Sequence, residues 1–221
     1  KDNVATPHGE VNDTVVAIPW KNIDNIAPAG SINSNVRDMA QWLRLQLGRG
    51  KHGTQQLITT GNHGEMWISN TTIRMEGPLA HYMAPGGNLS AYGMGWFLQD
   101  FSGRLAVHHG GNIDGMSAMV AMLPDEKLGV VILTNKNGTP APGAIFPYVF
   151  DLYTRDTPRD WNAEYHKMID PVMKMAKDAE SAADKARVLG TKPSLELAKY
   201  AGTYADSMYG DLTIGQAAGG L

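Results

Sequence analysis

The sequence predicts an α+β protein in which an antiparallel sheet lies between helical segments. Residues 91–135 contain four apolar segments separated by very short turns, whereas parallel neighbours need connections of a dozen or more residues. An amphipathic helix precedes this region at 36–47, and helical patterns follow it at 144–153 and 156–188. Antiparallel strands with helices before and after them are typical of the α+β class.

The region before the sheet is predicted to contain loops and two helices. Residues 1–30 are punctuated by Pro and Gly, which favours loops. A second, weaker helix is expected over about 59–69, where two glycines reduce the helical propensity. The first helix should begin after Ser34 as its N-cap and end at Gly48. Its apolar residues form one stripe at helical spacing: Val36, Met39, Ala40, Leu43 and Leu47.

Tight turns separate the four predicted strands. Residues 100–103 and 124–127 carry the Asp, Ser, Gly and Pro residues that such turns favour, and Gly110-Gly111 is expected to end the second strand. The last strand is rich in β-branched residues and should be buried on both faces. The strands are expected at 92–98, 105–109, 116–123 and 128–134.

Three domains are expected along the chain. Residues 1–155 form the main domain, and residues 156–190 form a charged, amphipathic helical connector that Pro171 kinks. Residues 191–221, with tyrosines between glycines, correspond to the start of a small β domain and are too few to close one. Because both ends of the sequence are abrupt, we expect the chain to be a piece of a longer protein.

The composition excludes several classes of function. A net charge of −3 offers no basic face for nucleic acid, and no apolar stretch approaches the ~20 residues of a membrane span. The absence of cysteine excludes thiol nucleophiles and cysteine-ligated metals. The seven histidines are scattered apart from His108-His109, and neighbours in a strand point to opposite faces, so we expect no metal and no cofactor.

One segment, from His109 to Gly115, stands out as a candidate site. Consecutive glycines at Gly110 and Gly111 weaken a strand, and they are tolerated where another backbone must approach, as when an extended substrate pairs with a sheet edge. The neighbouring histidine could bind a substrate carboxylate or transfer a proton. The alternative interpretation is a tight hairpin turn with an incidental histidine.

The surroundings of this segment resemble the C-terminal half of the serine β-lactamase-related family, which contains class C β-lactamases, DD-peptidases, D-aminopeptidases and carboxylesterases. The resemblance covers roughly residues 1–155 and rests on five pieces in a familiar order. These pieces are Pro28-Ala29-Gly30-Ser31-Ile32-Asn33-Ser34, Asp38-Met39-Ala40-x-Trp42-Leu43, Tyr92-Gly93-x-Gly95-Trp96, His109-Gly110-Gly111-x-x-x-Gly115, and Pro124 with Gly129-Val130-Val131-Ile132-Leu133-Thr134-Asn135.

The resemblance implies a β-lactamase/transpeptidase-like fold, incomplete here, with the start of a β-barrel-like domain near the C-terminus. It implies acyl transfer through a serine ester, with His109 and Asn112 in catalytic roles and Gly110 and Gly111 binding substrate. His109-Gly110-Gly111 matches the family's third motif, and the N–H of Asn112 would be one oxyanion-hole donor. A periplasmic or secreted location also follows from the resemblance.

The chain departs from the family pattern because no Ser-x-x-Lys and no Tyr-x-Asn occur in its 221 residues. The expected partners are therefore a small-molecule or peptide acyl substrate and the missing N-terminal half of the same domain. Two interpretations stay open: a part of a serine hydrolase, or a non-catalytic peptide- or ligand-binding remnant of the same fold. Because a histidine, unlike a lysine, is largely uncharged at neutral pH, esterase or peptidase activity is favoured over strong penicillinase activity.

Overall fold

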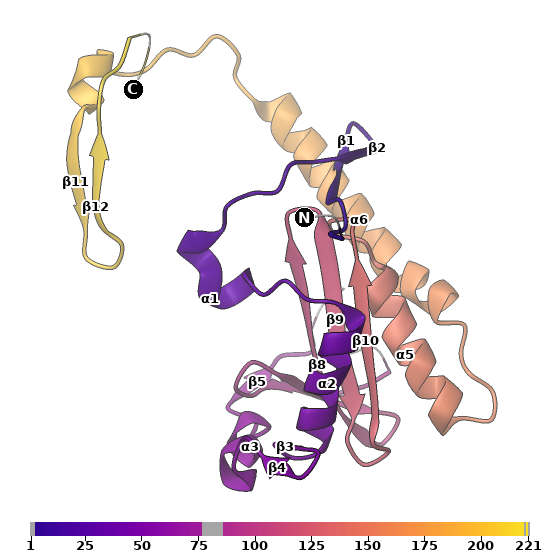
Figure 1. Cartoon of the computed structure of the whole chain (residues 1–221). Helices are drawn as coiled ribbons and strands as arrows, with labels where there is room; N and C mark the ends of the chain where they lie inside the picture. The colour runs from indigo at the N-terminus through magenta and orange to yellow at the C-terminus, as the bar shows by residue number, and fades with distance from the viewer. Residues whose placement is uncertain (1–2, 77–85, 219, 221) are drawn as a thin grey trace. The chain divides into compact units, whose positions relative to one another are not determined.

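A six-stranded antiparallel sheet is the centre of the larger of two units in the computed structural model (Figure 1). The structure describes residues 3–76, 86–218 and 220. The units span Lys1–Met175 and Ala176–Leu221. The strand order is β10-β9-β8-β7-β6-β5. In chain order the strands are β5 (Thr71–Ile73), β6 (Ser90–Tyr92), β7 (Phe97–Phe101), β8 (Arg104–Ile113), β9 (Met116–Leu123) and β10 (Leu128–Thr134).

The α+β class and the antiparallel pairing are confirmed, and β9 and β10 have the predicted bounds. Two predicted strands differ. The strand expected at 92–98 is split into β6 and β7, because Gly93 to Trp96 form a break between them. The strand expected at 105–109 runs on to Ile113, because β9 pairs with it through Gly110 and Gly111 and so compensates for their weak strand propensity.

Two separate apolar cores cover the two faces of this sheet. The α2 face packs against helix α2 (Val36–Leu47) and the α5 face against helix α5 (Ala141–Thr154). Successive residues of one strand alternate between them, as period-2 side chains must. The core on the α2 face consists of Leu43, Trp96, Leu98, Val107 and Met122. The core on the α5 face consists of Phe101, Ala106, Ala121, Leu123, Ile132, Phe146, Phe150 and Trp161.

Helix α2 has the predicted bounds but a different cap. The side chain of Asn35, not Ser34, accepts hydrogen bonds from the backbone N–H groups of Arg37 and Asp38. Asn35 is extended and immediately precedes the helix, which is the position at which a side-chain oxygen satisfies the first free donors. The prediction was one residue too early.

Helix α5 is joined to α6 (Trp161–Ala186) by a charged corner built around a buried carboxylate. The buried carboxylate of Asp151 accepts hydrogen bonds from the Arg159 guanidinium at 2.7 and 2.8 Å and from the Trp161 indole at 2.9 Å. Burial alone would raise the pKa of Asp151, but the hydrogen bonds from Arg159 and Trp161 outweigh burial and lower it.

Shorter elements complete the larger unit. Residues 1–30, expected as loops, include a hairpin and two short helical turns; helix α3 is shorter than predicted. The elements are β1 (His8–Val11), β2 (Thr14–Ala17), η1 (Asp24–Ile26), α1 (Ala27–Gly30), β3 (Lys51–His52), β4 (Gln55–Gln56) and α3 (Thr60–Met66).

The smaller unit contains the end of α6, a 3-10 turn η2 (Leu197–Tyr200) and a hairpin of β11 (Gly202–Asp206) and β12 (Gly210–Ile214). Helix α6 runs through Pro171 from one unit into the other, so the boundary at 175/176 lies inside the predicted connector. Among the helices of the described residues, none is long and apolar enough to cross a membrane.

Candidate active site

The His109-Gly110-Gly111 segment lies in the part of β8 that has a partner on one side only. Strand β7 pairs with β8 from Phe101 opposite Arg104 to Phe97 opposite His108. From His109 to Ile113, the register joins β8 to β9 alone within the described part of the chain. This stretch therefore presents a backbone edge on the side where β7 has ended.

The hairpin geometry determines which backbone groups face that edge. Two-residue turns join β8 to both neighbours, at Ser102-Gly103 and at Asp114-Gly115. Residues that flank such a turn exchange hydrogen bonds, and bonded and non-bonded pairs then alternate along the ladder. When this alternation is counted from either turn, the N–H and C=O groups of Gly111 point toward β9. The N–H and C=O groups of Gly110 and Asn112 point toward the open side.

The final glycine of the segment has a structural role. Gly115 closes the β8–β9 turn with φ of +87°, in the left-handed region that favours glycine. A Cβ atom there would clash with Cβ of Pro7, and the carbonyl of Gly115 accepts a 3.2 Å hydrogen bond from the N–H of His8. Gly115 thus shapes the turn that sets the alternation at the edge.

His109 is held by two hydrogen bonds. Its Nδ1 lies 2.7 Å from the carbonyl oxygen of Gly110, which only accepts, so Nδ1 carries a proton and donates it. Its Nε2 is hydrogen-bonded to the hydroxyl of Tyr92 at 2.9 Å. The ring of Phe97 packs beside His109 with centroids 5.4 Å apart. His109 is therefore an oriented imidazole whose outer nitrogen is bound by a phenol.

Tyr92 joins the candidate site through this hydrogen bond, whereas the sequence left open whether it lines a cleft. It belongs to the Tyr92-Gly93-x-Gly95-Trp96 piece of the resemblance, on β6, and is two strands away from His109. The register places Tyr92 opposite Phe97 and Phe97 opposite His108, so Tyr92 lies one residue along from His109 across the sheet, and its hydroxyl reaches His109 where β7 has ended. The aromatic residue in that motif was the feature of the sequence that could have indicated a contact with His109.

The side chain of Asn112 is engaged in holding loops. Its Oδ1 accepts hydrogen bonds from the Ser117 hydroxyl and, at 3.0 Å, from the N–H of Gly138. Ser117 is also 2.9 Å from the carbonyl of Lys136. These contacts tie the β8–β9 hairpin to the segment after β10. The catalytic role expected for Asn112 consequently concerns its backbone N–H, which the register directs to the open edge.

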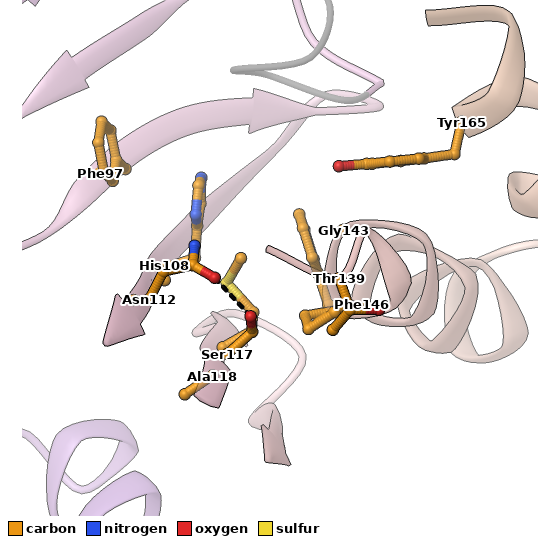
Figure 2. Close-up of a pocket in the computed structure, with 13 residues that line it drawn as sticks. Phe97, His108, Asn112, Ser117, Ala118, Thr139, Gly143, Phe146 and Tyr165 are labelled. Carbon is orange, nitrogen blue, oxygen red and sulfur yellow. Dashed lines mark hydrogen bonds between the residues drawn. The ribbon is translucent and has the colours of Figure 1, made fainter. Parts of the chain in front are cut away.

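A pocket lies on the opposite, α5 face of the same segment (Figure 2). Its volume is about 240 Å³, and its wall includes Gly110, Gly111 and Asn112. His108 lines it and contacts Phe146 of α5, whereas His109 is not among the residues of the pocket and is bonded to Tyr92. Alternation along β8 directs the side chain of His108 to the α5 face and that of His109 away from it. Within the described residues, no group of three or more His, Asp and Glu side chains could hold a metal ion.

Residues 1–153 match the sequence profile of the Beta-lactamase family. The match covers more than half of the chain, and the chain therefore belongs to the beta-lactamase family. It is 26% identical over 205 residues to the Unguisins hydrolase ungD' of Aspergillus campestris and 27% identical over 218 residues to the Unguisins hydrolase ungD of Aspergillus violaceofuscus. Each alignment covers 89% of this chain and 36% of the relative.

A solved structure supports the same fold. The octameric penicillin-binding protein homologue from Pyrococcus abyssi superposes with a TM-score of 0.54 and 22% sequence identity, over 70% of this chain and 31% of that chain. The β-lactamase/transpeptidase-like fold predicted from the resemblance is thereby confirmed. The chain spans about a third of the length of the curated relatives that it matches.

Proposed function

We propose that the protein containing this chain is a serine hydrolase that acts by acyl transfer on ester, peptide or β-lactam substrates. In this proposal the chain supplies the edge of β8 on which the substrate lies, and the attacking serine comes from outside the chain. The observation that carries the proposal is the open edge at Gly110–Asn112 next to an oriented imidazole, in a chain of the beta-lactamase family.

The chemistry follows from the edge geometry. An extended acyl group adds to the exposed edge of β8 as a further strand and bonds to the backbone of Gly110 and Asn112. The serine oxygen attacks the carbonyl carbon, and the carbonyl oxygen gains negative charge. The N–H of Asn112 stabilises this oxyanion, and loss of one such donor typically costs about 10²–10³ in turnover. The leaving group departs with a proton, and water then hydrolyses the serine ester.

A histidine in the third motif, in place of a permanently charged lysine, favours esters and peptides over β-lactams that need a cation for their carboxylate. Both ring nitrogens of His109 are already bonded, Nδ1 to the carbonyl of Gly110 and Nε2 to the hydroxyl of Tyr92, so neither is free for a substrate carboxylate in this arrangement. Two relatives are named hydrolases of unguisins, which agrees with hydrolysis of this general kind.

The test uses the full-length protein that contains this chain. We expect a fluorophosphonate to label a serine outside residues 1–221, located by mass spectrometry of peptides. We expect a larger kcat/KM for a short p-nitrophenyl ester than for a chromogenic cephalosporin. A larger value for the cephalosporin would contradict the substrate preference. Absence of labelling together with absence of hydrolysis would refute the enzyme and favour the alternative, a non-catalytic binding remnant.

A further inference from the structure

The pocket on the α5 face has mostly apolar walls, with Asn112, Ser117 and Thr139 among its lining residues. Its lining residues include Phe97, His108, Met119, Phe146 and Tyr165. None of the described residues that line it is Asp, Glu, Lys or Arg. In Figure 2 the side chain of Tyr165 reaches in from α6 with its hydroxyl directed toward the strand of His108. A pocket of this composition suits a neutral ligand with an apolar body.

His108 is a polar group in this apolar wall. It is 6% exposed and lies between the rings of Phe97 and Phe146, with both centroid distances 5.4 Å. Its Nε2 is 2.8 Å from Oε1 of Gln99, an acceptor, so Nε2 carries the proton of the neutral ring. Nδ1 is then an acceptor, is buried, and has no hydrogen-bond partner among the residues that the structure describes.

The unpartnered Nδ1 of His108 indicates that a hydrogen-bond donor is missing beside it. Burial, with a smaller contribution from the charge of His109, lowers the pKa of His108 to about 4, so the ring is neutral at physiological pH and Nδ1 keeps its lone pair. A buried acceptor without a donor costs free energy, and such groups are normally satisfied by protein, water or ligand. Nδ1 itself has almost no accessible surface, so a ligand with a hydrogen-bond donor would satisfy it once the His108 ring turns toward the pocket.

The size of the pocket sets the size of that ligand. An apolar cavity of about 150 Å³ accommodates benzene, so a pocket of about 240 Å³ has room for a substituted or fused ring. We propose that this pocket binds a neutral aromatic ring that carries one hydrogen-bond donor, a phenol or an indole, with Nδ1 of His108 as the acceptor. Stacked and edge contacts with Phe97 and Phe146 stabilise the ring.

The position of the pocket suggests where the ring comes from. Gly110 and Asn112 contribute both to its wall and to the open edge of β8. Alternate side chains of a strand added to that edge point to the α5 face. Under the proposed function, on which this step rests, the ring is a tyrosine or tryptophan side chain of the acyl substrate.

The test measures binding of indole and benzofuran to the full-length protein. Benzofuran has the shape of indole and lacks the N–H donor. We expect saturable binding of both, with indole about 10-fold tighter, which corresponds to one net hydrogen bond. In His108→Phe, which retains an aromatic ring but removes the acceptor, this ratio should fall to about 1.

Two variants locate the binding site, one that fills the pocket and one control outside it. Thr139 lines the pocket, whereas Asn137 is exposed and does not. We expect Thr139→Phe to weaken both probes at least 10-fold and Asn137→Phe to leave them unchanged. Absence of saturable binding, or binding insensitive to Thr139→Phe, would overturn the site. Equal affinities for indole and benzofuran in the unmodified protein would overturn the role of His108.

Measurements of hydrolysis distinguish a ring that belongs to the acyl substrate from a ring that belongs to a free ligand. If the ring belongs to the substrate, kcat/KM for the p-nitrophenyl ester of N-acetyltryptophan should exceed that for the N-acetylalanine ester at least 10-fold, and Thr139→Phe should remove the preference. Indole binding with no such preference would contradict the substrate side chain and identify a free aromatic ligand. Indole binding without any hydrolysis would refute the proposed function and leave the pocket assignment supported.

Discussion

At the scale of single residues, His109 is defined by the groups that bind its two ring nitrogens. The carbonyl of Gly110 fixes the proton on Nδ1, and the hydroxyl of Tyr92 binds Nε2. The strand alternation that separates His109 from His108 could be predicted from the sequence, because side chains in any strand alternate. The bond to Tyr92 could not, because it depends on the registers of two successive hairpins that join residues 17 positions apart.

The hydrogen bond between Tyr92 and His109 predicts that substitutions of these two residues have non-additive effects on kcat/KM. We expect His109→Ala to lower kcat/KM for an ester substrate of the full-length protein at least 10-fold while the protein remains folded. Tyr92→Phe should cost up to about 10-fold, the equivalent of one hydrogen bond. Because Tyr92 acts through His109 as a positioning residue, Tyr92→Phe should have no further effect in the His109→Ala background. Unchanged kinetics in His109→Ala would assign His109 a structural role. Additive losses of kcat/KM in the double variant would show that Tyr92 does not act by positioning His109.

At the scale of elements, β8 shows how tertiary pairing overrides local propensity. The glycines predict a strand end at Gly110-Gly111, yet the strand continues to Ile113 because β9 supplies a complete ladder. The bounds of β9 and β10 could be predicted because their apolar runs end at turn residues. The cap of α2 could not be placed to the residue, since Ser34 and Asn35 are both suitable and backbone geometry selects Asn35.

The corner between α5 and α6 gives a stability prediction with an internal control. Arg159 contacts Asp151 at 2.7 Å and lies 4.3 Å from the centroid of the Trp161 ring, whereas Arg155 contacts the same carboxylate at 4.0 Å from a more exposed position. We expect Arg159→Met to lower the free energy of unfolding by about 2–3 kcal/mol, because it leaves a buried carboxylate with fewer donors. Arg155→Met should cost less than about 0.5 kcal/mol.

Urea unfolding followed by tryptophan fluorescence measures both variants. The folded pKa of Asp151 is lowered, so its ion pair contributes fully above the unfolded pKa of about 4, and the contribution is lost as pH falls through the folded pKa. The difference between the unmodified protein and Arg159→Met should therefore shrink as the solution is acidified below about pH 4. Equal costs for the two variants would contradict the structural importance of the Arg159 contact.

At the scale of the whole molecule, the chain belongs to the beta-lactamase family and spans about a third of the length of its curated relatives, and in the proposed function it supplies the substrate edge. The order of motifs was sufficient to predict this family and fold, because each motif corresponds to an element of the sheet and its helices. The pocket on the α5 face was not predicted, since it is formed jointly by β8, β9, α5 and α6, which are distant in sequence.

The most direct test of the substrate edge is a crystal structure of the full-length protein with a phosphonate bound covalently to its reactive serine. We expect a phosphonyl oxygen, which takes the place of the oxyanion, to lie about 2.7–3.1 Å from the backbone nitrogen of Asn112. We also expect the ring of His109 to border the same group and to retain its hydrogen bond with Tyr92. A phosphonyl group bound away from the edge of β8, with Asn112 out of hydrogen-bond reach, would refute the proposed role of this edge.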